Sequence, residues 1–558
     1  MIVDLAKDAA PELPEYDVCV VGSGPAGATL ARELAGGPLR VCVLESGVRV
    51  PTQKGDALRS CESAGIRVKE WSRERVLGGA STTWAGLSSP LDPIDLAPRP
   101  WAGAPGWPIP RAELLALYEE AAARYRFPAA RDFGPEGFAR LRARGASQIA
   151  WKSLEEKVFL AAAEPQDFGR ECADAWAAAN VDLLLDATVV ELVAAGAPGA
   201  ARATAARVRT AHGELWVRAR AFVLAAGGIE NARLLLVSRG ACPAGLGNET
   251  GRVGLGFMNH PKNYFGILRL ARPIEELPYF FGALHGGFAG YAGLRLSEAR
   301  QRELGVLNSY ARFEPLFPWS DDAGVEALVT LVKRSQGLYS RWKRGRADEV
   351  VELRDWSETG DDSERQNARA GKLTTLRLAG SVVLHAPSVV RYAWFRLGRR
   401  RPAVRRVRLR HFLEMRPDDS NRIELAERGD AHGVPLPRVR HACGELDRRS
   451  LVELWRALRT ELAANGLGEL EGDLEHADPW PIDQDASHHM GATRMSADPR
   501  LGVVDPQLRL HGARNVWIAG ASVFPTSGCA NPTLTIVALS IRLARRLSQA
   551  LSGAEVAR

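Results

Sequence analysis

The first fifty residues alternate between short apolar runs and a turn rich in glycine. Residues 16–21 predict a buried strand, 28–34 a helix and 40–44 a second strand, which is followed by Glu45. Gly-Ser-Gly-Pro-Ala-Gly, residues 22–27, joins the first strand to the helix. This order is typical of a dinucleotide-binding βαβ unit, in which a pyrophosphate approaches the helix N-terminus and the acid binds ribose hydroxyls. The motif alone does not distinguish NAD from FAD.

Further elements follow from the same kind of pattern. Residues 221–236 predict a strand, a double glycine and a helix, and residues 101–127 predict a Pro-Gly loop that leads into an amphipathic helix. Apolar residues at helical spacing between 451 and 462 predict a helix that ends near Asn465 and Gly466. Residues 409–415 and 421–425 predict strands.

The C-terminal region predicts a helix with a sharp start. Asn531 is a favourable N-cap, Pro532 suits the first helical position, and the apolar residues that follow recur at helical spacing. The free N–H groups and the dipole at this helix end favour negative charge in front of it. His488 lies upstream, so two polar groups able to handle protons or bind oxygen, His488 and Asn531, occur in this region.

Length and composition agree with a large enzyme. The chain has 558 residues, of which 46% are hydrophobic and 25% charged, and this length predicts about two to three domains. No run of eighteen apolar residues and no signal-type N-terminus occur, so we expect a cytoplasmic protein. Seven scattered cysteines show no metal-ligand spacing, so no metal site and no disulfide framework are expected.

Positive charge is concentrated in one segment. The net charge is +7, and residues 391–411 contain nine arginines and no acid. This segment could bind a membrane surface, an acidic partner or an anionic substrate. A solvated helix face interrupted at Pro402 is the interpretation that we favour, because charge runs usually serve solvation. Nucleic acid is not an expected partner.

Three internal segments and the C-terminal region together resemble one known family. The internal segments are RVLGGASTTWAGLSS at 75–89, AFVLAAGGIENARLLL at 221–236 and VGLGFMNHP at 253–261. The C-terminal pattern consists of His488, Gly491, Arg494, Met495, Val503, Val504, Asp505, Asn531, Pro532 and Thr533. This set resembles the glucose-methanol-choline (GMC) family of flavin oxidoreductases over nearly the whole chain, closest to its sugar-, glycoside- and aminoglycoside-oxidising branch.

The resemblance implies an α/β fold with a discontinuous Rossmann-like FAD-binding domain and an α+β substrate domain on a mixed or antiparallel sheet. Residues 1–260 and 485–558 would form the FAD-binding domain, with 100–174 as a cap or linking segment. Residues 261–484 would form the substrate-binding domain.

The resemblance also implies which residues contact FAD. Some family members attach FAD through a histidine at the position of Thr83, so the cofactor is expected to be non-covalent here. Gly520 stands where many members carry an aspartate. The implied FAD contacts are Gly22, Gly24, Pro25, Ala26, Gly27, Glu45, Ser46, Gly78, Gly79, Ser81, Thr82, Thr83, Trp84, Ala85, Val189, Ala226, Gly227, Gly520, Ala521, Asn531, Pro532 and Thr533.

The implied reaction is oxidation of an alcohol group of a sugar-like or aminosugar-like molecule. A base of near-neutral pKa must take the hydroxyl proton while a hydride leaves the carbon, and an imidazole suits this role. His488 matches the family's base and Asn531 the partner that binds the substrate oxygen. His489 is expected to be a packing or supporting residue rather than a second base, and His260, between an asparagine and a proline, is expected to be structural.

Alternatives remain open at this stage. A few relatives use the scaffold as lyases or photodecarboxylases, and a non-catalytic flavin protein that transfers electrons is a further alternative. The substrate, the oligomeric state and the electron acceptor, whether oxygen, a quinone or another carrier, are not determined by the sequence.

Overall fold

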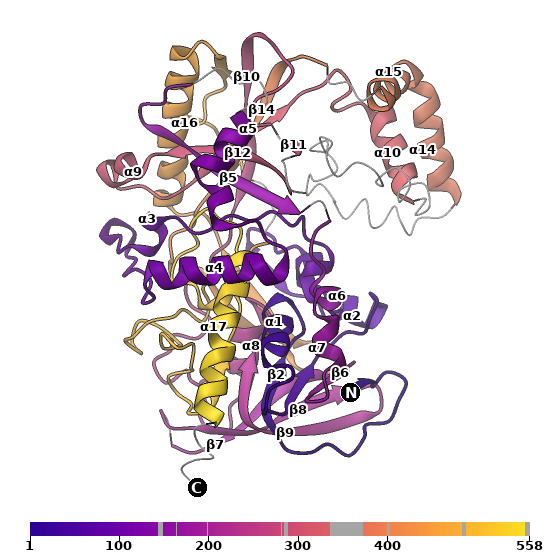
Figure 1. Ribbon diagram of the computed structural model, residues 1–558, viewed down its shortest axis with the longest axis vertical. Helices are drawn as coiled ribbons and strands as arrows, with labels where there is room; N and C mark the ends of the chain where they lie inside the picture. The colour runs from indigo at the N-terminus through magenta and orange to yellow at the C-terminus, as the bar shows by residue number, and fades with distance from the viewer. Residues whose placement is uncertain are drawn as a thin grey trace.

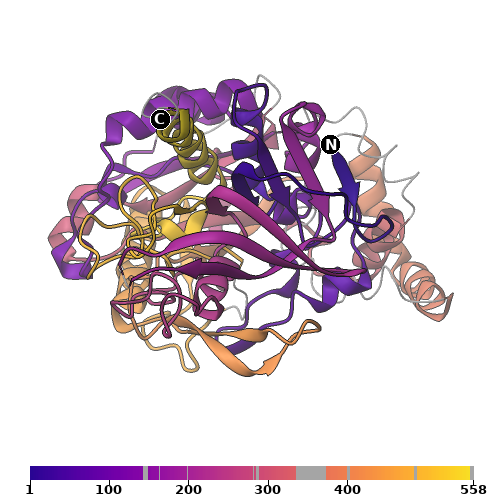
Figure 2. The ribbon, with the colours of Figure 1, turned by 90° about the horizontal axis from the view of Figure 1, so that it is seen from below.

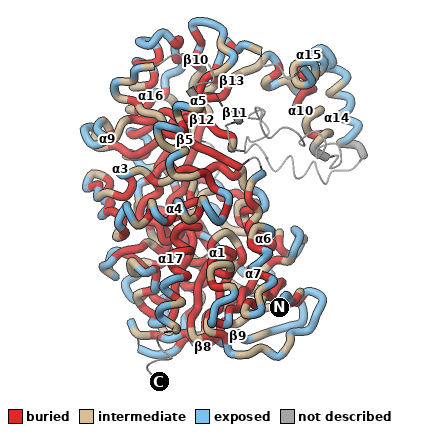
Figure 3. The backbone as a smooth tube through the Cα atoms, in the orientation of Figure 1, coloured by how far each residue is buried: buried red, intermediate tan, exposed pale blue. Residues whose placement is uncertain are grey.

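A computed structural model of the protein describes residues 1–142, 149–162, 164–197, 199–280, 282–283, 288–334, 372–398, 402–482 and 487–552. Two large sheets lie one above the other along the long axis of the molecule, and both ends of the chain lie near the lower sheet (Figure 1). Buried residues follow the strands of both sheets and continue through α17 (Figure 3).

The lower sheet has eight strands. Five parallel strands lie in the order β1 (Ile2–Asp4), β6 (Val181–Leu185), β3 (Val41–Leu44), β2 (Tyr16–Val21) and β9 (Gly213–Leu224). β18 (Val516–Ile518) adds a parallel strand to β9, while β8 (Arg202–Thr210) and β7 (Thr188–Ala195) continue the sheet antiparallel. All four residues of β3 are buried, as expected for a parallel strand covered on both faces.

Helices cover one side of this sheet, and the β15–β16 hairpin lies on the other (Figure 2). The covering helices include α1 (Pro25–Leu34), α4 (Arg111–Tyr125), α7 (Ala173–Ala177) and α17 (Thr533–Ser552), while α8 (Glu230–Val237) packs against the hairpin. β15 (Arg422–Gly429) pairs with β16 (Pro435–His441), which pairs in turn with β4 (Glu62–Gly65). Residues 422–441 therefore join the same small sheet as an N-terminal strand.

The upper sheet is antiparallel. Its order is β11 (Gly282–Ala283), β12 (Phe288–Leu296), β13 (Tyr310–Pro315), β14 (Val404–Phe412), β10 (Lys262–Ile274) and β17 (Gly468–Glu471), and β5 (Leu154–Ala162) also pairs with β12. α16 (Glu445–Ala464) buries Leu451, Leu454 and Leu458 in the same apolar cluster as β10 and β14. Leucine at this helical spacing explains why α16 covers this sheet.

Shorter elements complete the chain. The helices are α2 (Gln53–Ala57), α3 (Pro93–Leu96), α5 (Pro135–Arg142), α6 (Phe168–Glu171), α9 (Glu298–Leu304), α10 (Ala323–Arg334), α14 (Lys372–Leu384) and α15 (Ala386–Leu397), with 3₁₀ turns at Glu70–Arg73, Gly79–Thr82, Pro100–Ala102, Ala130–Phe133 and Ala521–Val523. No helix of the described ranges is both long and apolar enough to cross a bilayer.

The predicted fold class is confirmed, while several predicted element limits change. α1 begins at Pro25 rather than at residue 28, because proline is well suited to the first helical turn. α17 begins at Thr533, and Ile536 N–H donates to the Pro532 carbonyl, so Pro532 rather than Asn531 is the N-cap. The strand predicted at 409–415 is β14, five residues earlier at its start.

The interpretation of the arginine-rich segment as one solvated helix face is wrong in its second half. Arg391 and Arg396 lie on α15, but residues 404–412 form β14 inside the upper sheet. The alternation of β14 places Val407 and Leu409 on one face and Arg408 and Arg410 on the other. Arg410 is buried, so the segment does not serve solvation alone.

Candidate active site

The turn between β2 and α1 needs glycine for steric reasons. Gly22 has a φ of +103°, and a Cβ there would lie 2.6 Å from the Ala225 carbonyl oxygen. A Cβ on Gly27 would lie 1.9 Å from the Gly22 carbonyl oxygen. The turn therefore packs its backbone against the end of β9 and leaves the free N–H groups at the start of α1, which includes Pro25 and Ala26, available to an anion.

Glu45 and a second glycine turn meet at the same helix end. The buried Glu45 carboxylate accepts hydrogen bonds from Ser23 N–H (3.0 Å), Ser23 Oγ (2.7 Å) and Gly47 N–H (2.8 Å). Gly78 N–H donates to Ser23 Oγ at 3.2 Å, and a Cβ on Gly79 would lie 3.1 Å from the Gly24 Cα. A Cβ on Gly24 itself would meet nothing within 4 Å. Several of the predicted nucleotide contacts therefore lie together at the start of α1, next to the unfilled space at Gly24.

The hydroxyl side chains of the second turn mostly stabilise the turn itself. Ser81 Oγ donates to the Gly78 carbonyl at 2.6 Å, and Thr82 Oγ1 donates to the Gly79 carbonyl at 2.9 Å. Thr83 Oγ1 reaches the Ala80 carbonyl at 3.4 Å. Trp84, next to Ala85, donates its indole N–H to the Gln166 carbonyl at 2.7 Å. Ser46 donates to Glu45 at 3.3 Å.

Asn231 connects two more of the predicted segments. Its amide oxygen accepts the Ala226 N–H at 2.9 Å, and its amide nitrogen donates to the Ala519 carbonyl and to Ser522 Oγ, both at 3.0 Å. The loop of Ala226 and Gly227 therefore lies beside the 519–522 loop, which contains Gly520 and Ala521. The link depends on a residue that the sequence analysis did not single out.

Val189 joins this region through the backbone. It lies on β7, two residues after Ala187, whose N–H donates to the Glu45 carbonyl at 2.8 Å.

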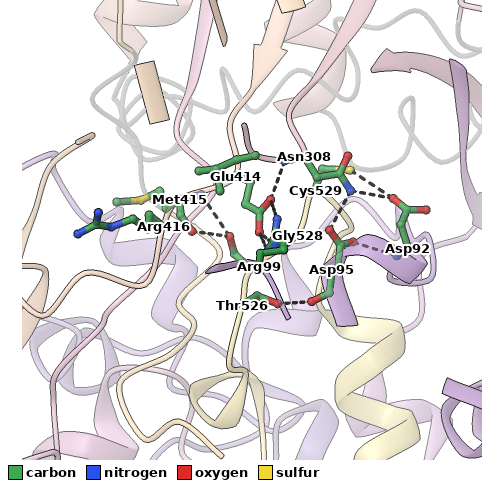
Figure 4. Close-up of polar contacts among 12 residues, drawn as sticks. Asp92, Asp95, Arg99, Asn308, Glu414, Met415, Arg416, Thr526, Gly528 and Cys529 are labelled. Atoms are coloured by element: carbon green, nitrogen blue, oxygen red, sulfur yellow. Dashed lines mark hydrogen bonds and ion pairs between the residues drawn. The ribbon is translucent and has the colours of Figure 1, made fainter. Parts of the chain in front are cut away.

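The loop before α17 is fixed by a buried polar network (Figure 4). Arg99 and Glu414 form a fully buried ion pair, with nitrogen–oxygen distances of 2.7 and 2.5 Å. Glu414 also accepts the backbone N–H of Gly528 at 3.1 Å, and Thr526 Oγ1 donates to the Asp95 carbonyl at 2.8 Å. The 526–528 loop is thus held by groups from two distant parts of the chain, Asp95 and Glu414.

His488 lies against His260 in the resulting site. The two Nδ1 atoms are 2.9 Å apart, and the rings are nearly perpendicular. The backbone N–H of His488 donates to Asn259 Oδ1 at 2.9 Å. Met258 and Met490, which lie two residues from His260 and His488 on each segment, exchange backbone hydrogen bonds. His260 Nε2 is 2.9 Å from the Gly528 carbonyl oxygen. His260 therefore connects His488 to the loop that precedes Asn531.

This network selects one tautomer of each ring. A carbonyl oxygen only accepts, so His260 Nε2 carries the proton and donates to Gly528. The Nδ1 of neutral His260 is then an acceptor, and His488 must donate its Nδ1–H to it. The His488 Nε2 is left with a free lone pair, which is the form that a general base requires.

Both imidazoles are neutral near pH 7. Burial lowers the pKa of His260 to about 4. Burial, followed by the charges of His260 and Lys262, lowers the pKa of His488 well below its usual value. His488 is therefore in its unprotonated form at neutral pH.

The structure brings most of the predicted residues together but leaves one pair linked only indirectly. Among the described residues, no hydrogen bond joins His488 to Asn531 itself, and the connection runs through His260 and Gly528, three residues before Asn531. His489 turns elsewhere, 3.3 Å from Ser72 Oγ, and its carbonyl packs against Gly228. Pro532 and Thr533 lie at the start of α17.

Sequence reasoning missed two residues of this arrangement. His260 was expected to be structural, although it contacts His488, and Asn259 holds the His488 backbone. The one available signal was the Asn-His-Pro sequence immediately before β10. In the described ranges, no cluster of three potential metal ligands is present.

Comparison with known proteins supports a common origin for this architecture. Residues 417–540 match the GMC oxidoreductase family. The chain is 24% identical to paromamine 6'-oxidase of Streptomyces fradiae, over 96% of this chain and 91% of that protein. It is 27% identical to the fructose dehydrogenase large subunit of Gluconobacter japonicus, over 59% of this chain and 47% of that protein, about half of its length.

Solved structures share the fold. The pyridoxine 4-oxidase of Mesorbium loti superposes with a TM-score of 0.53 at 16% identity, covering 95% of this chain and 99% of that one. A formate oxidase of Aspergillus oryzae RIB40 gives a TM-score of 0.55 at 16% identity, covering 97% and 99%.

Proposed function

We propose that this chain is a GMC oxidoreductase, the family that residues 417–540 match, and that it oxidises an alcohol group of a sugar-like small molecule with FAD, using His488 as the base. The observation that carries this proposal is the His260–His488 pair, because its hydrogen bonds leave His488 Nε2 free to accept a proton.

FAD fits the residues of the nucleotide site. Gly24 and Gly79 leave a narrow backbone cradle at the start of α1, and Glu45 directly follows β3, the position of the ribose-binding acid in such a unit. Thr83 lacks an imidazole, so we propose non-covalent binding. The parts that hold FAD would be residues 1–260 and 485–558, with 261–484 binding the substrate. When bound, FAD supplies the hydride acceptor of the reaction.

The protein's own residues account for the proton. His488 Nε2 takes the hydroxyl proton of the substrate and becomes an imidazolium, whose Nδ1–H remains bonded to His260 Nδ1. His260 keeps its own Nε2 proton throughout and donates it in a hydrogen bond to the Gly528 carbonyl. Asn531, three residues further on, would bind the substrate oxygen with its amide. The Arg99–Glu414 pair keeps this loop in place.

The substrate class follows from the relatives. Proteins named for oxidation of paromamine, 6'''-hydroxyparomomycin C and fructose, together with C-glycoside 3-oxidases and a pyranose 2-oxidase, are similar to this chain. A sugar or aminosugar alcohol is therefore the proposed substrate, and oxygen, a quinone or another carrier would reoxidise the flavin.

The test is anaerobic reduction of the bound flavin by a panel of sugars, aminosugars and polyols. His488→Ala should lower the reduction rate by about 10² to 10⁴-fold with unchanged flavin content, because a general base contributes that much. His441→Ala is the matched control, since His441 is buried and neither of its ring nitrogens has a hydrogen-bond partner in the described part of the chain. If no alcohol bleaches the flavin, the lyase, photodecarboxylase and electron-transfer alternatives replace this proposal. An unchanged rate in the variant would remove His488 from the mechanism.

A further inference from the structure

One face of the upper sheet carries two rows of side chains beside the proposed active site. Tyr310, Phe412 and Lys262 are cross-strand partners on β13, β14 and β10 and form the first row. Arg312, Arg410 and Tyr264 are the next set of partners and form the second row. Residues two apart on a strand share a face and lie about 7 Å apart, so the second row lies one step beyond the first.

The first row borders the catalytic residues. Tyr310 belongs to the same buried cluster as Cys529, which lies two residues before Asn531. Lys262 follows His260 by two residues, and His260 contacts His488. The second row is therefore about one step of the sheet away from the place where the proposed reaction occurs.

Arg312 differs from every other buried arginine of the described chain. Eight arginines are buried, and seven of them lie within 4.0 Å of a carboxylate. The seven are Arg59, Arg73, Arg99, Arg233, Arg295, Arg410 and Arg542. Arg312 is only 2% exposed, and among the described residues no carboxylate lies within that distance of it.

The surroundings of Arg312 compensate its charge incompletely. Its guanidinium lies 4.6 Å from the centre of the Tyr291 ring, which favours a cation, but its buried Nε and Nη2 have no hydrogen-bond partner among the described residues. The nearest acid of the same strand, Glu314, already faces Arg408 at 3.2 Å and Arg410 at 3.8 Å. Burying a guanidinium without a carboxylate partner costs free energy of folding unless a bound anion balances its charge and accepts its hydrogen bonds.

We propose that Arg312 binds an anionic group, a carboxylate or a phosphate ester, of the sugar-like substrate. This inference rests on the proposed function. The planar guanidinium matches both anions, because it presents parallel N–H donors to two oxygens. The separation of the two rows is on the order of one sugar ring, so an acid group at one side of the ring would meet Arg312 while a hydroxyl at the other side meets His488.

Binding can be measured without turnover. The flavin-loaded protein would be titrated with D-glucuronate, D-glucose 6-phosphate and D-glucose at fixed ionic strength, while its thermal unfolding midpoint (Tm) is recorded. At least one anionic sugar should raise the Tm at a concentration ten- to hundredfold below that of D-glucose, because a charge-assisted hydrogen bond is worth that factor. A larger Tm shift with D-glucuronate would indicate a carboxylate-bearing substrate, and a larger shift with D-glucose 6-phosphate would indicate a phosphorylated one.

Three variants make the assignment specific. Arg312→Met should abolish the advantage of the anionic sugars, Arg312→Lys should retain part of it, and Arg405→Gln should keep all of it. Arg405 is exposed on β14, so its replacement changes the net charge equally away from the site. Without ligand, Arg312→Met should be at least as stable as the wild type, because it removes a poorly paired buried charge.

The outcomes are separable from those of the proposed function. Equal binding of all three sugars, no shift with either anion, or an advantage that survives Arg312→Met would overturn the assignment. A lower Tm of Arg312→Met without ligand would mean that Arg312 is structural. Flavin reduction by neutral sugars alone would leave the proposed oxidation intact and refute only the role of Arg312.

Discussion

Replacing His260 by leucine tests how His488 is prepared for its role. His260 accepts the Nδ1–H of His488 and donates its own Nε2–H to Gly528. Leucine provides neither group, so the variant removes the partner that fixes the His488 tautomer. We expect a slower flavin reduction with a nearly unchanged half-saturating substrate concentration, because His260 acts on the base and not on the substrate.

The size of the effect follows from the charge that develops on His488. As His488 becomes an imidazolium, its 2.9 Å hydrogen bond to His260 becomes charge-assisted. Such a bond contributes about 1.5–3 kcal/mol, which corresponds to about 10- to 150-fold in rate. His260→Gln should recover much of this loss, since an amide can accept from His488 with its oxygen and donate to Gly528 with its nitrogen.

The pH dependence gives a second readout. Burial is the largest cause of the low pKa of His488, and His260 is itself neutral above a pH of about 4. In the wild type the base is therefore unprotonated down to pH values well below 6.5, and the reduction rate should be flat across neutral pH. Without His260 the His488 imidazolium loses its hydrogen-bond acceptor, so the pKa of His488 should not rise, and the slower rate of the variant should stay flat over the same range of pH.

Stopped-flow reduction under anaerobic conditions between pH 5 and 9 measures both quantities, with flavin content and Tm as checks on folding. His441→Leu is the matched control, because it removes another buried histidine, whose ring forms no hydrogen bond to any residue that the structure describes. Wild-type rates in His260→Leu would refute the role assigned to the pair.

Two further predictions concern the cofactor and stability. Gly24→Ala should leave the unfolding midpoint of the flavin-free protein unchanged, since Gly24 has a φ of −64° and its Cβ would meet nothing within 4 Å. The same variant should weaken FAD binding about tenfold or more, because the added methyl group fills the cradle. Equal flavin affinity would show that no ligand uses this space. Burial and then the charge of Asp92 raise the pKa of Asp95 from 3.8 to about 7, so its protonation in the folded state makes stability fall as pH rises between these values. Asp95→Asn should remove this slope in urea unfolding at a series of pH values, and an unaltered slope would contradict the assignment.

Local sequence patterns were sufficient for the nucleotide-binding half. The predicted strand at 16–21 is β2, and the glycines at 22–27 occupy a turn whose backbone contacts exclude larger residues. These features are readable because glycine spacing and apolar periodicity report on neighbours in the chain. The helix predicted around 451–462 was recovered for the same reason.

The contacts around His488 could not be derived in this way. His260 and His488 are 228 residues apart, and nothing in the local sequence of either indicates the other. The arginine-rich segment was interpreted as a helix face because its charges show no clear helical or strand periodicity. In the structure, Val407 and Leu409 of β14 lie on one face of the strand, and Arg408 and Arg410 lie on the other. Arg312 could not be recognised from the sequence, since what distinguishes it is that no carboxylate of the described residues pairs with it.

The buried Arg99–Glu414 pair is better explained by positioning than by stability. Two charges taken out of water recover little net energy, and an apolar pair of similar volume is often as stable. Here, however, Glu414 also accepts the backbone N–H groups of Asn308 and Gly528, at 2.7 and 3.1 Å, which an apolar side chain cannot do. The Gly528 carbonyl is in turn the acceptor that fixes the tautomer of His260, and through it that of His488. The ion pair therefore orients His488, the proposed base, through the 526–528 loop. The conservative variant Glu414→Gln should lower the rate of flavin reduction even if its unfolding midpoint stays close to that of the wild type.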